Sequence, residues 1–151
     1  MEYQISVAQH ATQKALVITQ SLAREDIREY LDAAFPEVAA LLAQRGVTAA
    51  GPPFARYRVD ADTFYVTAGI PVPNGVEGSG RVRLDELPGG DIASTVHVGS
   101  YEELPAAFHA VIEWLPGAGY TITGDPWESY LDQPDVPQPR TQVNFPVTRR
   151  T

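Results

Sequence analysis

Hydrophobic residues recur every three or four positions between Glu25 and Arg45. This spacing puts them on one side of an α-helix and predicts an amphipathic helix over that range. Pro36 falls inside it, and because proline lacks a backbone donor we expect it to kink or divide the helix. Gly46 follows as a C-terminal cap. The hydrophobic positions are Ile27, Tyr30, Leu31, Ala34, Val38, Leu41 and Leu42.

A second helix is predicted from Ser100 to Leu115. Ser100 and Glu103 have the spacing of a capping box, in which each side chain bonds a free backbone N–H of the first turn. Pro105 is tolerated because it lies close to the helix start. Gly119 follows as a helix terminator, as Gly46 follows the first helix.

Short runs rich in β-branched and aromatic residues lie on both sides of these helices and predict β-strands. Turn-forming residues separate them at Asp60–Asp62 and Leu87–Gly90, and Asn74–Gly78 is expected to be a linker. The predicted strands are Ile5–Ala8, Ala15–Thr19, Phe54–Val59, Phe64–Val72, Gly80–Leu84, Ile92–Val98, Trp127–Leu131 and Thr141–Val147.

The second half of the chain repeats the first. Residues 33–57 align without a gap with residues 106–130, and ten of the 25 pairs are identical. Chance would give about one or two matches for ordinary composition. The identical pairs are Ala33/Ala106, Ala34/Ala107, Phe35/Phe108, Val38/Val111, Leu42/Leu115, Gly46/Gly119, Thr48/Thr121, Gly51/Gly124, Pro53/Pro126 and Tyr57/Tyr130.

The repeat predicts the fold class. Each copy reads strand, helix, strand, strand, with repeat 1 covering about residues 3–73 and repeat 2 about residues 80–148. Both copies belong to a single domain over residues 1–151. We therefore expect an α+β protein with a mostly antiparallel sheet, two helices on one face and a ligand cleft between the copies.

Composition narrows the classes of function. The net charge is −8 and no basic stripe is present, so direct DNA binding is not expected. The chain has no cysteine, and its histidines lack metal-ligand spacing, so we expect neither a metal nor a cofactor. No leader-like segment or membrane span is visible, which predicts a cytoplasmic location and no membrane contact.

One segment resembles a known family. Gly124–Leu131 reads GDPWESYL, and upstream His97–Tyr101 reads HVGSY, leading from a predicted strand into the second helix. Together with the duplication, these residues resemble the GyrI-like small-molecule-binding family, also called the bacterial transcription-activator effector-binding domain. The resemblance implies a duplicated strand-helix-strand-strand module that binds small molecules. It covers about residues 3 to 147, so the expected protein is a stand-alone sensor without a DNA-reading arm.

The resemblance also implies an acidic residue that faces the ligand cleft among aromatic rings, here Glu128. Independently, alternation along a strand places Glu128 and Tyr130 on one face and Trp127 on the other. The equivalent position in the first copy is Ala55, so the fold itself does not require the charge. A solvated surface glutamate is the alternative interpretation.

Four further aromatic residues are candidate ligand contacts. Tyr57 is the repeat partner of Tyr130, and Tyr65 alternates with Phe64, so that register decides which of those two faces the ligand. Tyr101 either closes the mouth of the cleft or merely begins the helix. Trp114 takes the helix position of Leu41 and either packs in the core or forms a cleft wall.

Three functions are compatible with these residues. The first is a binding protein that senses or sequesters small hydrophobic, aromatic or cationic compounds, because a carboxylate among aromatic rings suits such ligands. The second, drawn from the resemblance, is a hydrolase that opens strained electrophiles such as cyclopropane-bearing natural products. In it Glu128 acts as general base, with Tyr130 as the other catalytic candidate. The third, from the same source, is a protein partner that inhibits DNA gyrase.

Overall fold

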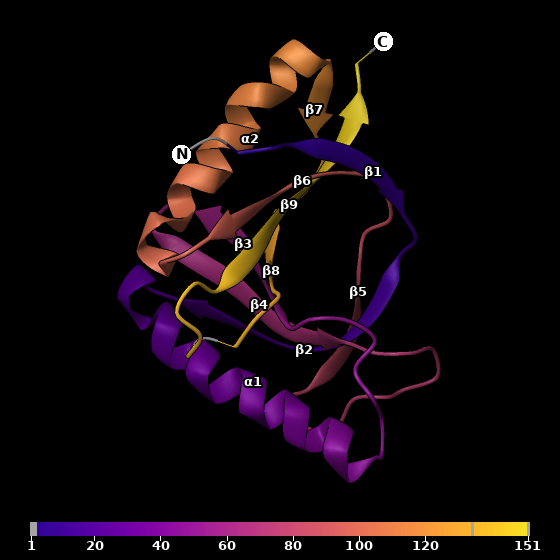
Figure 1. The fold of residues 1–151 in the computed structure, drawn as a ribbon. Helices are drawn as coiled ribbons and strands as arrows, with labels where there is room; N and C mark the ends of the chain where they lie inside the picture. Colours follow the sequence, from indigo (N-terminus) through magenta and orange to yellow (C-terminus); the bar gives the residue numbers. More distant parts are fainter. Residues whose placement is uncertain (1–2, 134, 151) are drawn as a thin grey trace. The chain divides into compact units, whose positions relative to one another are not determined.

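The computed structural model describes residues 3–133 and 135–150 (Figure 1). The chain forms two compact units. Thr12–Leu87 make up one, and the segment ending at Ala11 joins the residues from Pro88 onward in the other. We call them the inner unit and the outer unit, because the first is enclosed in sequence by the second.

The inner unit is one helix on a four-stranded antiparallel sheet. The strands run in the order β3-β4-β2-β5. In Figure 1 helix α1 lies along this sheet, and it contacts β2 and β4. The elements are β2 (Gln13–Leu22), a short 3-10 turn η1 (Arg24–Asp26), α1 (Ile27–Gln44), β3 (Phe54–Asp60), β4 (Thr63–Pro71) and β5 (Arg83–Leu87).

Helix α1 is held to the sheet by its buried face and by one tyrosine. Tyr30 points its hydroxyl at the carbonyl oxygens of Ile18 on β2 and Val66 on β4. Burial raises the pKa of this phenol above its ordinary value, because the charged form would lose its hydration. Pro36 does not divide the helix, which runs on to Gln44 and ends before Gly46, a residue with φ of 65°.

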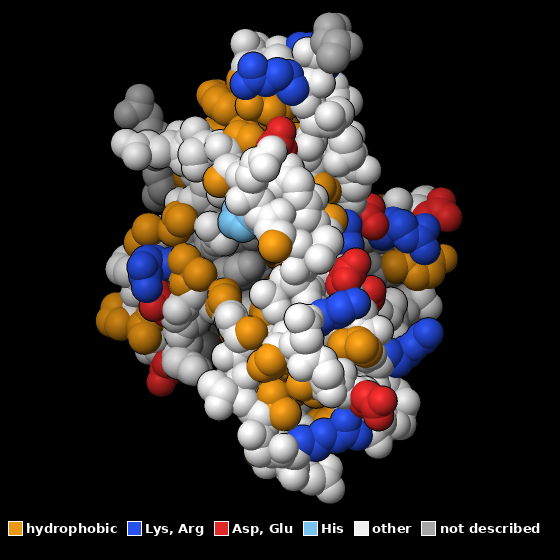
Figure 2. All heavy atoms as spheres, turned by 90° about the vertical axis from the view of Figure 1, so that its right-hand side faces the viewer, with side chains coloured by type: hydrophobic (Ala, Val, Ile, Leu, Met, Phe, Trp, Pro, Cys, Tyr) orange, Lys and Arg blue, Asp and Glu red, His pale blue; other side chains and the backbone are white. Residues whose placement is uncertain are grey.

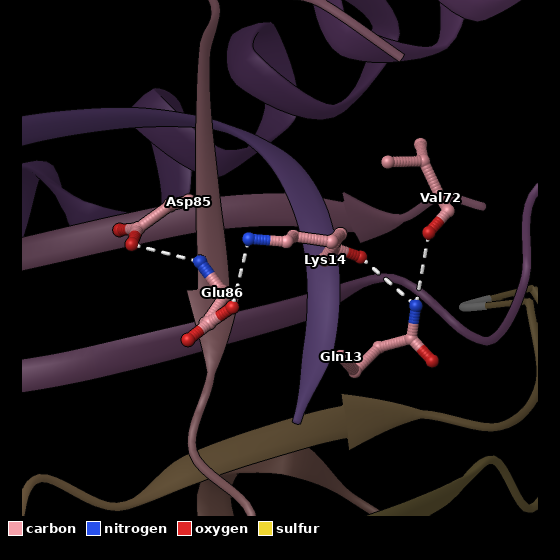
Figure 3. A network of polar contacts seen from close by, with 5 residues as sticks. All are labelled: Gln13, Lys14, Val72, Asp85 and Glu86. Carbon is pink, nitrogen blue, oxygen red and sulfur yellow. Dashed lines mark hydrogen bonds and ion pairs between the residues drawn. The ribbon is translucent and has the colours of Figure 1, made fainter. Parts of the chain in front are cut away.

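The edge strand β5 pairs with β2, and Figure 3 shows the polar contacts around the start of β2, one of which joins the two strands. Lys14 pairs with Glu86 at 2.9 Å, and the Gln13 amide donates to the carbonyl oxygens of Lys14 and Val72, each at 3.0 Å. The sequence predicted this strand at residues 80–84, but it lies at 83–87. The reason is a tight turn in which Ser79 bridges Val82, which takes up the first residues of the predicted range.

The outer unit has the same plan. Its strands run in the order β1-β6-β9-β8, with a short strand β7 also paired to β9, and all pairs are antiparallel. Helix α2 contacts β6 and β7. The elements are β1 (Ser6–His10), β6 (Gly90–Val98), a 3-10 turn η2 (Tyr101–Glu103), α2 (Leu104–Ala118), β7 (Tyr120–Ile122), β8 (Trp127–Tyr130) and β9 (Arg140–Arg149).

The core of the outer unit lies between α2 and one face of its sheet. The ring of Phe145 on β9 meets Phe108 of α2 edge to face, with centroids 5.8 Å apart. The helix ends at Gly119, whose φ of 88° is the left-handed conformation that favours glycine. The buried cluster consists of Ala93, Leu104, Ala107, Val111, Leu115, Val143, Phe145 and Val147.

The two units carry the sequence repeat at equivalent places. β3 begins at Phe54 and β8 begins at Trp127, which are aligned in the repeat. On the helices, the identical pairs Ala34/Ala107, Val38/Val111 and Leu42/Leu115 are all buried. The α+β class and the duplicated strand-helix-strand-strand module are therefore confirmed.

The outermost strands do not follow the repeat. β1 lies at the start of the first copy but pairs with β6 of the second, and β5 lies at the start of the second copy but pairs with β2 of the first. Each unit is thus completed by a strand from the sequence of the other copy. Alternation patterns predict strands, not which strands pair, so this exchange was not foreseen.

Candidate functional site

The site residues lie on the helix-covered face of the outer unit's sheet. Residues directly opposite each other in neighbouring antiparallel strands share a face. Glu128 is opposite Val143, a member of the core under α2, and Tyr130 is opposite Thr141. β6 is the other strand paired with β9, and there His97 is opposite Thr141. One row across three strands is therefore His97, Thr141 and Tyr130, with Glu128 in the next row.

Glu128 is a buried carboxylate with a tyrosine donor. Its side chain is only 7% exposed, and the Tyr130 hydroxyl donates to its Oε1 at 2.6 Å. Such short bonds to a carboxylate are strong, and they offset part of the cost of removing a charge from water. Strand alternation accounts for the contact, because residues two apart in β8 point to the same side. The predicted shared face of Glu128 and Tyr130 is what the structure shows.

Tyr101 adds a second aromatic ring beside this pair. It begins η2, and its ring meets that of Tyr130 edge to face, with centroids 6.1 Å apart. Ser100 caps this turn by accepting a hydrogen bond from the N–H of Glu102 at 3.1 Å. The predicted capping box with Glu103 is thus replaced by a cap on the preceding 3-10 turn.

His97 is fully buried and has partners at both ring nitrogens. Nε2 lies 2.8 Å from the carbonyl oxygen of Ser100, and Nδ1 lies 2.8 Å from the hydroxyl of Tyr3. Because a carbonyl can only accept, Nε2 carries the proton, and the Tyr3 hydroxyl then donates to Nδ1. Burial, and next the charge of Glu103, raise the pKa of Tyr3 above its ordinary value. His97 therefore fixes the segment that leads into η2.

Thr141 differs from its polar neighbours. Its side chain is fully buried, and within the described residues its Oγ1 has no hydrogen-bond partner. The next polar residue on this face, Thr95, donates its hydroxyl to the carbonyl oxygen of Gln4 at 2.8 Å. Sequence reasoning missed Thr141, because a long loop separates β8 from β9 and no pattern fixes their register.

The equivalent place in the inner unit is apolar. Ala55 occupies the position of Glu128, is fully buried and lies opposite Ala68. Tyr57, opposite Val66, shares the face of these alanines. Tyr65 lies on the other face, opposite Arg58, whose guanidinium is 4.1 Å from the ring centroid. Phe64, two residues from Val66 on β4, has the helix-side orientation instead.

Trp114 belongs to a second aromatic group in the outer unit. It is 36% exposed and stacks on Tyr120 of β7, with centroids 6.4 Å apart. Arg149 of β9 covers the same tyrosine, with its guanidinium 5.5 Å from the ring centroid and Nη2 3.1 Å from the hydroxyl. The structure thus brings Glu128 together with Tyr130 and Tyr101, and it groups Trp114 with other residues.

Charge is dispersed over the surface shown in Figure 2. Acidic and basic side chains there alternate with small groups of hydrophobic ones. In the part of the chain that the structure describes, no three histidine, aspartate or glutamate side chains are placed to hold a metal ion. Within the same residues, no helix is both long enough and apolar enough to cross a bilayer.

The fold is shared with proteins of known structure. The C-terminal domain of EcmrR superposes with a TM-score of 0.84 at 19% identity, covering 99% of both chains. A hydrolase from Listeria innocua gives 0.72 at 15% identity, covering 96% of this chain and 92% of the other. SAV2435 bound to tetraphenylphosphonium gives 0.67 at 13% identity, covering 98% and 94%. Among curated proteins, none has a sequence that matches this chain significantly.

A protein-family model provides the assignment that such low identities cannot. The model described as the GyrI-like small molecule binding domain matches residues 8–147, from β1 to β9. The match includes the aligned segments of both copies of the repeat, as well as His97, Glu128, Tyr130 and Thr141. This chain belongs to the GyrI-like small molecule binding domain family.

Proposed function

We propose that this protein binds hydrophobic aromatic cations beside Glu128 and thereby senses or sequesters them. The observation that carries the proposal is a 7% exposed glutamate that accepts a hydrogen bond from Tyr130, whose ring in turn meets that of Tyr101. A buried carboxylate is costly unless a charge or donors compensate it, and aromatic faces attract organic cations. Only one of the two copies carries the acid, which supports a role in binding rather than in folding.

One similar structure supports a ligand of this kind. SAV2435, which shares the fold, is bound to tetraphenylphosphonium, an aromatic cation. In the EcmrR–DNA complex the matching region covers 58% of that chain, so the rest of EcmrR lies outside the likeness. For this protein we propose a small organic ligand as the partner, and with a net charge of −8 we propose no direct contact with DNA.

The test is Glu128→Gln, which keeps the shape of the side chain and removes its charge. Loss of a partly desolvated charge–π contact corresponds to about 1–2 kcal/mol, so the Kd of a cationic rhodamine dye should rise about five- to thirtyfold. Fluorescence titration measures it. Glu113→Gln, an exposed acid on α2, is the matched control and should leave the Kd unchanged. An anionic dye of similar size should bind more weakly than the cation to the wild type.

A second candidate is hydrolysis of a strained electrophile such as a cyclopropane-bearing compound. The supporting observation is the 2.6 Å bond between Tyr130 and Glu128, a pair of groups able to accept and donate a proton. Glu128 would take a proton from water, whose oxygen forms a bond to a ring carbon as a ring C–C bond breaks. The Tyr130 hydroxyl would protonate the released carbon and regain a proton from Glu128, so that the net reaction is the addition of water. The Listeria innocua hydrolase has the same fold, which is all that 15% identity supports.

The same variant separates the two candidates. A general base acts on the transition state, so in a hydrolase Glu128→Gln should abolish turnover while substrate binding stays nearly intact. Mass spectrometry of the compound, incubated with wild type and variant, detects the addition of water. A wild type that binds cationic dyes but leaves the compound unchanged would reject the hydrolase.

A further inference from the structure

We infer that the Thr141 hydroxyl is a ligand contact, and that the site therefore favours organic cations carrying N–H donors over cations without them. The inference rests on the proposed function, because it concerns the ligand bound beside Glu128. It starts from the one polar atom of this region that has no partner within the described residues.

An unpartnered buried hydroxyl is unfavourable for folding. Such a group loses its hydrogen bonds to water and gains none in return. Valine would have nearly the same shape and would avoid this loss. The same face of β9 carries a buried valine at position 143, in the next row. Thr141 thus has a cost that its place in the core does not explain.

The neighbours of Thr141 do not relieve this cost. His97, opposite on β6, uses both ring nitrogens, one with Tyr3 and one with the Ser100 carbonyl. Tyr130, opposite on β8, donates its hydroxyl hydrogen bond to Glu128. Each of these polar side chains is committed to a protein partner, and Thr141 between them is the exception.

The placement of Thr141 indicates what it would bind. Glu128 is its diagonal neighbour on β8, and diagonal side chains in adjacent antiparallel strands start about 7–8 Å apart. One planar cation can span that distance. A carboxylate only accepts hydrogen bonds, and a threonine hydroxyl can accept as well. Two acceptors side by side suit a protonated amine or amidinium, which supplies several N–H donors.

A cation without N–H groups would give the Thr141 hydroxyl no hydrogen-bond donor. Tetraphenylphosphonium or a fully alkylated ammonium can meet the charge of Glu128 and the aromatic rings, but it gives the hydroxyl nothing to accept. The hydroxyl should therefore contribute to the binding of N–H cations alone. A net hydrogen bond of ordinary strength corresponds to about a three- to tenfold difference in Kd.

The experiment uses two dyes that differ only in N-methylation: the methyl ester of rhodamine with two free amino groups, and its tetramethyl analogue. Thr141→Val removes the hydroxyl, and Thr141→Ser keeps it. In Thr141→Val the Kd of the amino dye should rise about three- to tenfold while that of the tetramethyl dye stays unchanged. Thr141→Ser should bind both dyes as the wild type does. Without ligand, Thr141→Val should have a Tm equal to or above that of the wild type.

The outcomes separate this inference from the proposed function. If the wild type binds neither dye, or if Glu128→Gln binds both as well as the wild type, the proposed function fails and the inference with it. If both dyes bind through Glu128 and Thr141→Val weakens both equally or neither, only the role of Thr141 is overturned. Should Thr141→Val not fold, a Thr141→Ala variant and the same dye pair decide by the same criterion.

Discussion

At the scale of single residues, comparing the two copies of the repeat shows which buried side chain occurs in only one of them. Ala55 and Glu128 occupy equivalent, buried positions, and only the second is charged. Sequence alternation could predict that Glu128 and Tyr130 share a face, because that depends only on a spacing of two. It could not predict Thr141, whose place opposite Tyr130 depends on how β8 and β9 pair across residues 131–139.

The bond between Tyr130 and Glu128 should be measurable as stability. Tyr130→Phe removes the donor and leaves a buried carboxylate with one hydrogen bond fewer. We expect a loss of about 1.5–3 kcal/mol in the free energy of unfolding, the range for bonds to charged groups. Urea unfolding measures it. Tyr120→Phe, which loses an exposed bond to Arg149, is the control and should change stability far less. Equal losses in the two variants would mean that the bond between Tyr130 and Glu128 contributes no more to stability than the exposed one.

At the scale of elements, the helices were the most predictable part and the sheet edges the least. α1 and α2 have long hydrophobic stripes, and both end near glycines with positive φ. β7 has three residues and pairs only with β9, so no pattern of that length could reveal it. β5 was predicted three residues early, since a turn rather than hydrophobic alternation fixes where it begins.

Helix burial gives a prediction with an internal control. Val111 lies on the core-facing side of α2 and is fully buried, whereas its neighbour Ile112 on the same helix is 44% exposed. Val111→Ala should lower the free energy of unfolding by about 1–3 kcal/mol, from lost burial and the cavity left behind. Ile112→Ala should stay within about 0.5 kcal/mol. Thermal or urea unfolding compares them, and a larger effect at Ile112 would contradict the assignment of the buried face.

The raised pKa of Tyr30 leads to a prediction for the stability of the protein at high pH. Burial raises the pKa of its folded-state phenol, so above about pH 10 the unfolded chain loses this proton more readily than the folded chain does. Its contribution to stability is full below the unfolded pKa and is lost as pH rises through the folded pKa. Tyr30→Phe should therefore lose less stability than the wild type between about pH 8 and pH 11. Urea unfolding across that range is the measurement, and parallel curves would contradict it.

At the scale of the whole molecule, the repeat indicated two equivalent units but not which strands each unit contains. Pro88 and the residues after it form the outer unit only together with β1, whose N–H and C=O groups cover one edge of β6. Strand pairing between distant segments leaves no trace in the local hydrophobic pattern. Knowledge of this strand pairing was not needed to recognise the family resemblance, the class of fold or Glu128 as a candidate.

Removing β1 should therefore affect the outer unit first. A chain that begins at Thr12 lacks one of the two strand partners of β6 and the Tyr3 contact to His97. We expect the amide hydrogens of β6 to exchange faster with deuterium, while those of β2 and β4 stay protected. Hydrogen exchange followed by mass spectrometry resolves the two regions. Equal loss of protection in both units would mean that they unfold as one.

The exchange of β1 and β5 also sets an order of assembly on the ribosome. The inner unit is one continuous stretch and can close as soon as Leu87 has emerged. β1 is made before the inner unit, yet it waits with both edges unpaired until β6 follows some eighty residues later. The unit that carries Glu128 thus forms after the inner unit. Slow synthesis between the two copies would prolong the exposure of β1, and that interval is when capture by a chaperone, or pairing with a neighbouring nascent chain, has most time to occur.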